Sequence, residues 1–204
     1  AVQLCAACKT RTAQTIAASA ALPIDVFGEN HVQELCANYD AGAYCGKPSH
    51  FIGHLQTNKI KKVLGRASLI QSVDSEHLLL AIEKEAAKAG IVQNVLLEVN
   101  IGREAAKSGF APEKVLPAAE ASLERTHVRV RGLMTIPPAD AQRDANFRYF
   151  QEVQALYVDM NQKLFHNELE YLSMGMSGDY EDAIRAGATM VRVGSAIFGA
   201  RHYN

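Results

Sequence analysis

The stretch LIQSVDSEHLLLAIEKEAAKAGIVQNVLLEVN, residues 69–100, predicts a strand, a helix and a second strand. Its two ends are short apolar runs, which are typical of strands buried on both faces. Between them Ser75 can cap the start of a helix with leucines on one face, and Gly90 can end that helix. Because a helical crossover joins parallel strands, this unit predicts an α/β protein with a parallel sheet.

The same alternation extends through the whole chain of 204 residues. Eight short apolar runs, separated by segments with helical spacing, begin at Leu4, Ile24, His50, Leu69, Asn94, Val128, Leu169 and Met190. Eight strands alternating with helices predict one (β/α)8 TIM barrel domain over residues 1–204. A doubly wound open sheet is the alternative, but neither a Rossmann glycine fingerprint nor a Walker loop supports it. The sequence starts inside the first strand, so we expect that a helix closing the barrel bottom can precede Ala1.

Composition narrows the possible partners and the cellular location. The net charge is -1 and 48% of the residues are hydrophobic, so one domain can bury a substantial core without a basic surface for nucleic acid or anionic membrane. The locally basic segment 58–66 is interpreted as the solvated face of a short helix. No apolar run is long enough to span a membrane, and no signal peptide opens the chain. We therefore expect a cytoplasmic protein.

Two motifs with metal-like or redox-like spacing are interpreted as structural. Cys5 and Cys8 lie three residues apart on an expected strand, so they point to opposite faces and predict two buried thiols. His50 and His54 have the spacing of metal ligands, but Gly53 interrupts the element and no third ligand is near. We expect no metal site.

Polar residues follow the expected strands at the carboxyl rim, where barrels carry out their chemistry. They are Lys9, Glu29, Asn30, His54, Gln56, Asp74, Asn100, Met134 with Thr135, Ser177, and Gly194 with Ser195. Two of them have an ordinary alternative. Asn30 could cap the helix that begins near residue 31, and Asp74 could belong to the turn before Ser75.

The loops after the seventh and eighth strands predict a phosphate site. Ser177 and Gly178 precede one expected helix, and Gly194 and Ser195 follow the last strand. Barrels commonly bind phosphate with these two loops, through free backbone N–H groups, hydroxyl donors and glycines that allow close approach. The alternative is that the glycines only permit tight turns and Ser177 only caps a helix.

Across from this site, Lys9 at the end of the first strand could attack an aldehyde and form a Schiff base, unless it is an ordinary surface lysine. A sugar phosphate turned over by an aldolase or pyridoxal phosphate would fit, although Schiff-base aldolases place their lysine on a later strand. Arg192 lies on the same strand face as Gly194, where it could meet a pyridoxal ring nitrogen and keep it unprotonated. A surface salt bridge is the alternative for Arg192.

The motifs CKT (8–10), FGENHVQE (27–34), HFIGHLQTNKIKKV (50–63), VNIGREAAKSGF (99–110), RVRGLMTIPP (129–138) and LSMGMSGDYEDAIRAGATMVRVGSAIFGAR (172–201) together resemble the YggS/PROSC family of pyridoxal phosphate homeostasis proteins. The resemblance spans nearly the whole chain. It implies a barrel of the alanine racemase N-terminal type (fold type III) with pyridoxal 5'-phosphate on Lys9. It further implies that the cofactor is held by Asn30, His54, Met134, Ser177, Gly178, Arg192, Gly194 and Ser195.

The sequence departs from the family pattern in two places. Cys8 stands where a serine is expected before the lysine, and YDAGAYCGKPS, residues 39–49, is unlike the usual helical segment. Neither departure removes a residue expected to hold the cofactor. A thiol beside Lys9 could make the cofactor link sensitive to oxidation.

The resemblance implies a cofactor carrier rather than an enzyme. Racemases of this fold append a β domain and take a second proton-transfer tyrosine from a partner, whereas this chain ends nine residues after Ser195, with Tyr203 as the nearest candidate. We therefore expect a protein that holds the cofactor without strong catalysis. A racemase and a sugar-phosphate aldolase are the alternatives. Expected partners are pyridoxal phosphate and the apo-enzymes that use it, and the expected state is a monomer or weak dimer.

Overall fold

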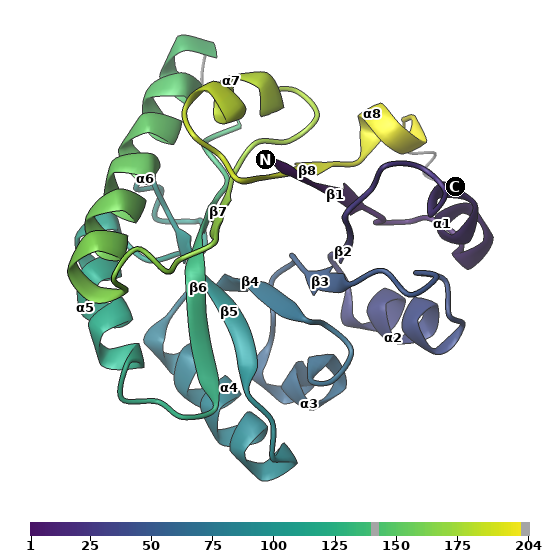
Figure 1. Cartoon of the computed structure of the whole chain (residues 1–204), viewed down its shortest axis with the longest axis horizontal. Coiled ribbons are helices and arrows are strands. Elements are labelled where there is room, and N and C mark those ends of the chain that lie inside the picture. The colour runs from purple at the N-terminus through teal and green to yellow at the C-terminus, as the bar shows by residue number, and fades with distance from the viewer. Residues whose placement is uncertain (140–142, 201–204) are drawn as a thin grey trace.

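Eight parallel strands close into a barrel in the computed structural model, which describes residues 1–139 and 143–200 (Figure 1). Each strand pairs with its neighbours in chain order, and β8 closes the ring against β1. The strands are β1 Gln3–Ala7, β2 Val26–Glu29, β3 Ser49–Phe51, β4 Leu69–Val73, β5 Gln93–Val99, β6 Val128–Thr135, β7 Tyr171–Ser173 and β8 Met190–Val193. The predicted (β/α)8 barrel is confirmed, and the open sheet is wrong.

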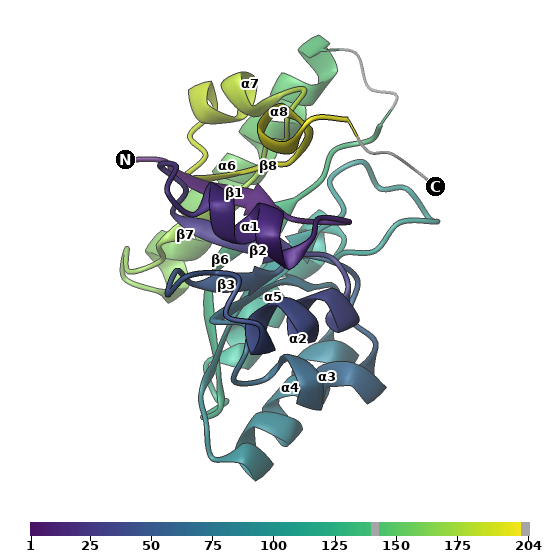
Figure 2. The ribbon, with the colours of Figure 1, turned by 90° about the vertical axis from the view of Figure 1, so that its right-hand side faces the viewer.

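Helices surround the barrel, with α5 and α6 along one side and α1 and α2 on the opposite side (Figures 1 and 2). Their bounds are α1 Ala13–Ser19, α2 Val32–Asp40, α3 Ile60–Val63, α4 Glu76–Ala89, α5 Pro112–Ser122, α6 Arg143–Leu164, α7 Tyr180–Arg185 and α8 Ser195–Phe198, with a 3-10 turn, Thr57–Lys59, before α3. Within residues 1–139 and 143–200, no helix combines the length and apolar character needed to cross a membrane.

Local sequence signals set the helix ends. The Ser75 hydroxyl accepts a hydrogen bond from the Leu78 N–H at 3.2 Å, and Gly90 ends α4 with φ of 66°, as predicted. The alternative that Asn30 caps α2 is wrong, because His31 occupies the N-cap position and makes no side-chain capping bond. Asn30 is thereby left to face the barrel rim.

The barrel wall separates two apolar regions. Cys8 packs in the layer between strands and helices, whereas Cys5 packs inside the barrel with Val26 and Met190. The prediction that Cys5 and Cys8 are buried on opposite faces is therefore confirmed. All cysteines are free thiols.

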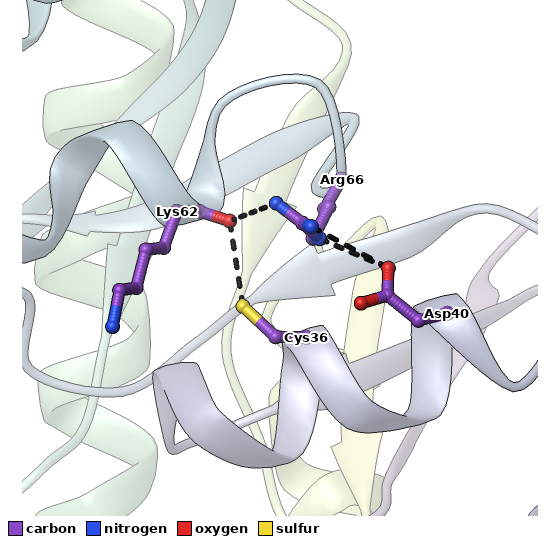
Figure 3. Close-up of polar contacts among 4 residues, drawn as sticks. All are labelled: Cys36, Asp40, Lys62 and Arg66. Atoms are coloured by element: carbon purple, nitrogen blue, oxygen red, sulfur yellow. Dashed lines mark hydrogen bonds and ion pairs between the residues drawn. The ribbon is translucent and has the colours of Figure 1, made fainter.

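The basic segment 58–66 forms the short turn and α3, and polar contacts join it to α2 (Figure 3). Arg66 donates a hydrogen bond to the Lys62 carbonyl at 3.1 Å and forms an ion pair with Asp40 at 3.4 Å. The Cys36 thiol donates to the same Lys62 carbonyl at 3.7 Å. The Lys61 side chain is 75% exposed. These cations serve surface contacts within the fold, in line with the interpretation of a solvated helix face.

Candidate functional site

A cavity of about 310 Å³ opens at the carboxyl end of the barrel, where β1, β2 and β8 end. Seven of the nine residues predicted to hold the cofactor line it: Lys9, Asn30, Ser177, Gly178, Arg192, Gly194 and Ser195. Apolar side chains of Ile52, Ile136 and Met176 complete the wall, together with Ala7 and Arg11. The closed barrel brings these residues together because all parallel strands end at the same rim.

Lys9 lies two residues beyond the end of β1 and is half-buried. The turn that carries it is fixed at both sides, because the Arg11 N–H donates to the Cys8 carbonyl at 2.9 Å and the Thr10 N–H donates to Glu34 Oε1 at 3.0 Å. Thr10 has φ of 66°, a left-handed conformation that few non-glycine residues adopt. The turn therefore presents the Lys9 amine to the cavity from a defined backbone.

Backbone donors gather in the cavity wall formed by the loops after β7 and β8. The Gly194 and Ala196 N–H groups both donate to the Ser177 hydroxyl, at 3.3 and 3.4 Å. Two N–H groups converging on one oxygen by long bonds are also suited to an anionic oxygen. A Cβ at Gly178 would meet no atom within 4 Å, whereas one at Gly194 would lie 3.2 Å from the Ala7 carbonyl oxygen. The loops thus combine donors with open space beside Gly178, which fits a phosphate group.

Arg192 enters the cavity from inside the barrel and is 4% exposed. Its Nη1 donates to Ser173 Oγ at 2.6 Å and its Nη2 donates to the Thr135 carbonyl at 3.0 Å. The alternative of a surface salt bridge is wrong, since the side chain is buried and its two hydrogen bonds go to Ser173 on β7 and Thr135 on β6. Burial lowers the pKa of the guanidinium, yet an arginine still carries its charge at neutral pH.

Arg11 is a third cation in the cavity wall, besides Lys9 and Arg192, and sequence reasoning missed it. It donates to the Gly199 carbonyl at 2.8 Å and lies 5.7 Å from the centre of the Phe198 ring. It therefore ties the Lys9 turn to the loop that supplies the backbone donors. Its position two residues after Lys9, in the same rim loop, was the available signal.

His54 and Met134 are not brought to this cavity. The His54 side chain is 64% exposed and its Nδ1 lies 3.3 Å from Asp74 Oδ2, so both groups form a surface pair. Met134 is 1% exposed and packs with Leu69 and Leu96 inside the barrel. The placement implied for these two residues needs correction, because Met134 lies within β6 and packs in the closed interior, whereas Ile136 follows the end of β6 and lines the cavity.

Glu29 ends β2 on the opposite side of the barrel wall from the cavity and is fully buried. Its Oε1 accepts hydrogen bonds from Asn38 Nδ2 at 2.8 Å and from the Tyr44 hydroxyl at 3.0 Å, while its Oε2 has no hydrogen-bond partner among the described residues. Burial raises the pKa of this carboxyl to about 7. It is a structural group that titrates near neutral pH.

Comparison with known proteins places this site in a family. Residues 1–202 match the family model of the alanine racemase N-terminal domain. The pyridoxal phosphate homeostasis protein of Aquifex aeolicus is 44% identical over 180 residues, covering 88% of this chain and 78% of the relative. The protein of the same name from Pseudomonas aeruginosa is 38% identical, covering 99% of this chain and 86% of the relative.

Solved structures agree with the fold. PipY of Synechococcus elongatus, solved with pyridoxal phosphate (PLP) bound, matches with a TM-score of 0.88 and 30% identity over 97% of this chain and 92% of PipY. An alanine racemase of Clostridium difficile matches in fold alone, with a TM-score of 0.79 and 16% identity over 100% of this chain and 53% of the racemase. The chain belongs to the YggS/PROSC family of pyridoxal phosphate homeostasis proteins, within the larger family of the alanine racemase N-terminal domain.

Proposed function

We propose that this protein binds pyridoxal 5'-phosphate, holds it through Lys9, and takes part in homeostasis of the cofactor without strong catalysis of its own. One observation carries the proposal: a single cavity is lined by an amine, Lys9, by the loops whose backbone donors converge on Ser177, and by the buried Arg192 guanidinium. The homeostasis proteins among its relatives and the PLP-bound PipY structure support the choice of ligand.

Lys9 is the residue that would hold the cofactor covalently, through its Nζ, and no further reactant is needed. The two amine hydrogens and the aldehyde oxygen would be released as water. When bound, the cofactor supplies an aldehyde and an electron-withdrawing ring. Arg192 presents donors only, so it disfavours a proton on the ring nitrogen and keeps the ring a weak electron sink. This favours holding the cofactor over using it.

The residues of the cavity also favour a carrier over a racemase. Two-base racemisation needs a second group that exchanges a proton. Among the described residues that line the cavity, Lys9 is the only amine, and no carboxylate, imidazole, thiol or phenol accompanies it. Tyr203, considered from the sequence, lies outside the described residues. The proposal extends to apo-enzymes as recipients of the cofactor, to a monomer or weak dimer, and to a cytoplasmic location.

The test is an absorbance spectrum of the protein mixed with pyridoxal phosphate, followed by borohydride reduction and peptide mass mapping. A visible band whose reduced adduct maps to the peptide with Lys9 supports the proposal. A protein that stays colourless and unmodified contradicts it. Parallel assays of alanine racemisation and of sugar-phosphate cleavage test the two enzymatic alternatives, and turnover in either assay would replace the carrier.

Gly178→Ala should weaken binding of the phosphate without affecting the fold. The added methyl group meets no protein atom within 4 Å, so we expect unfolding free energy within about 0.5 kcal/mol of the wild type. The same methyl group occupies space assigned to the phosphate, and we expect the dissociation constant for pyridoxal phosphate to rise about tenfold. Pyridoxal, which lacks the phosphate, is the control ligand. An equal loss of affinity for both would place the phosphate elsewhere.

A further inference from the structure

A chain of hydrogen bonds crosses the inside of the barrel from the cavity floor. It starts with Arg192 on β8, which donates to Ser173 Oγ on β7 at 2.6 Å. The Ser173 hydroxyl donates to Gln71 Oε1 on β4 at 2.6 Å, and Gln71 Nε2 lies 3.0 Å from His50 Nδ1 on β3. Each of these four side chains is at most 4% exposed.

The directions of these bonds are mutually consistent. Arg192 can only donate, so Ser173 Oγ accepts from it and uses its own hydrogen toward Gln71 Oε1. The Gln71 amide then turns its Nε2 toward His50 Nδ1, which must accept. Burial lowers the pKa of His50 to about 4, so the ring is neutral and can accept at Nδ1. Turning the Gln71 amide over would leave the Ser173 hydrogen without an acceptor.

Gln71 stands in an interior that is otherwise largely apolar. The barrel interior also contains the apolar side chains of Met190, Leu69, Leu96 and Met134. Burying an amide among them costs free energy unless each of its polar atoms is hydrogen-bonded. Within the described residues, the side chain of Gln71 makes its hydrogen bonds to Ser173, His50 and Met190, none of which lines the cavity, and Gln71 does not line the cavity itself. What it provides is the acceptor that orients the Ser173 hydroxyl under Arg192.

We propose that Gln71 is a positioning residue: acting through Ser173, it holds the Arg192 guanidinium in the orientation in which it meets the bound cofactor. The inference rests on the proposed function. Nη2 is held by the Thr135 carbonyl and Nη1 by Ser173, so the plane of the guanidinium is fixed at two points. Without Gln71, the Ser173 hydroxyl can rotate, and the hydrogen bond that it accepts from Arg192 Nη1 is weakened.

The test compares Gln71→Leu with Gln93→Leu. Gln93 is a matched control because it is also a buried glutamine, 3% exposed, but its amide donates to the carbonyls of Ala67 and Asn94, away from the cavity. We expect Gln71→Leu to raise the dissociation constant for pyridoxal phosphate about tenfold and to shift the absorbance bands of the bound cofactor. Gln93→Leu should lower thermal stability similarly and leave affinity and spectrum unchanged.

A double-mutant cycle separates a connected chain from two independent losses. Ser173→Ala removes the link, so it should reproduce the effect of Gln71→Leu, and the double variant should be no worse than Ser173→Ala alone. Additive losses, or a Gln71→Leu spectrum and affinity equal to those of Gln93→Leu, would overturn the inference. If Gln71→Leu does not fold, Ser173→Ala decides, since wild-type affinity and spectrum in that variant would also overturn it. Failure of the wild type to bind the cofactor would instead overturn the proposed function.

Discussion

Lys9→Ala is expected to abolish the borohydride-stable adduct between this protein and pyridoxal phosphate. Lys9 is the only amine among the described residues that line the cavity, and alanine would leave no amine there to form the proposed C=N bond. The donors at Ser177, Gly194 and Ala196 are untouched, so the variant should still bind the cofactor noncovalently and more weakly. Mass mapping after reduction measures the first effect, and equilibrium dialysis measures the second.

Lys59→Ala is the matched control for Lys9→Ala. Lys59 is also half-buried and follows β3, but it does not line the cavity. Its variant should keep the adduct at wild-type occupancy. Full occupancy of an adduct in Lys9→Ala, mapped to any other lysine, would show that the anchor lies elsewhere and would contradict the proposed role of Lys9.

Glu29→Gln is expected to change how the stability of the protein depends on pH. The pKa of this carboxyl rises from 4.5 to about 7 on folding, so the unfolded chain releases the proton more readily than the folded one. The stability due to the protonated carboxyl is therefore present below pH 4.5 and is lost as the pH rises through 7. The loss amounts to about 3 kcal/mol in the wild type.

Urea unfolding at pH 5 and pH 8 measures this effect. Glutamine keeps the acceptor for Asn38 and Tyr44 but cannot ionise, so Glu29→Gln should lose less stability than the wild type between these two pH values. His50, whose lowered pKa acts in the opposite direction, contributes equally to both proteins. Glu113→Gln, at an exposed carboxylate paired with Arg103, is the control and should behave as the wild type. Parallel pH profiles for all three proteins would contradict the prediction.

The barrel and most of its rim could be predicted from the order of residues alone. Eight apolar runs alternating with capped helices admit few folds, and in a parallel barrel every residue that follows a strand reaches the same end. For that reason Lys9, Ser177 and Gly194 could be assigned to one site without coordinates. The opposite faces of Cys5 and Cys8 followed from the two-residue period of a strand.

Which rim residues lie together, and which side chains pack beneath them, follows only from the folded barrel. His54 belongs to the rim by sequence, yet it turns outward to Asp74, and Arg11 takes a place in the cavity wall. The hydrogen bond from Arg192 to Ser173 joins residues 19 positions apart, and the one from Ser173 to Gln71 joins residues 102 positions apart. Such contacts depend on the stagger of neighbouring strands around the closed barrel, a property of the whole ring that no local pattern of residues encodes.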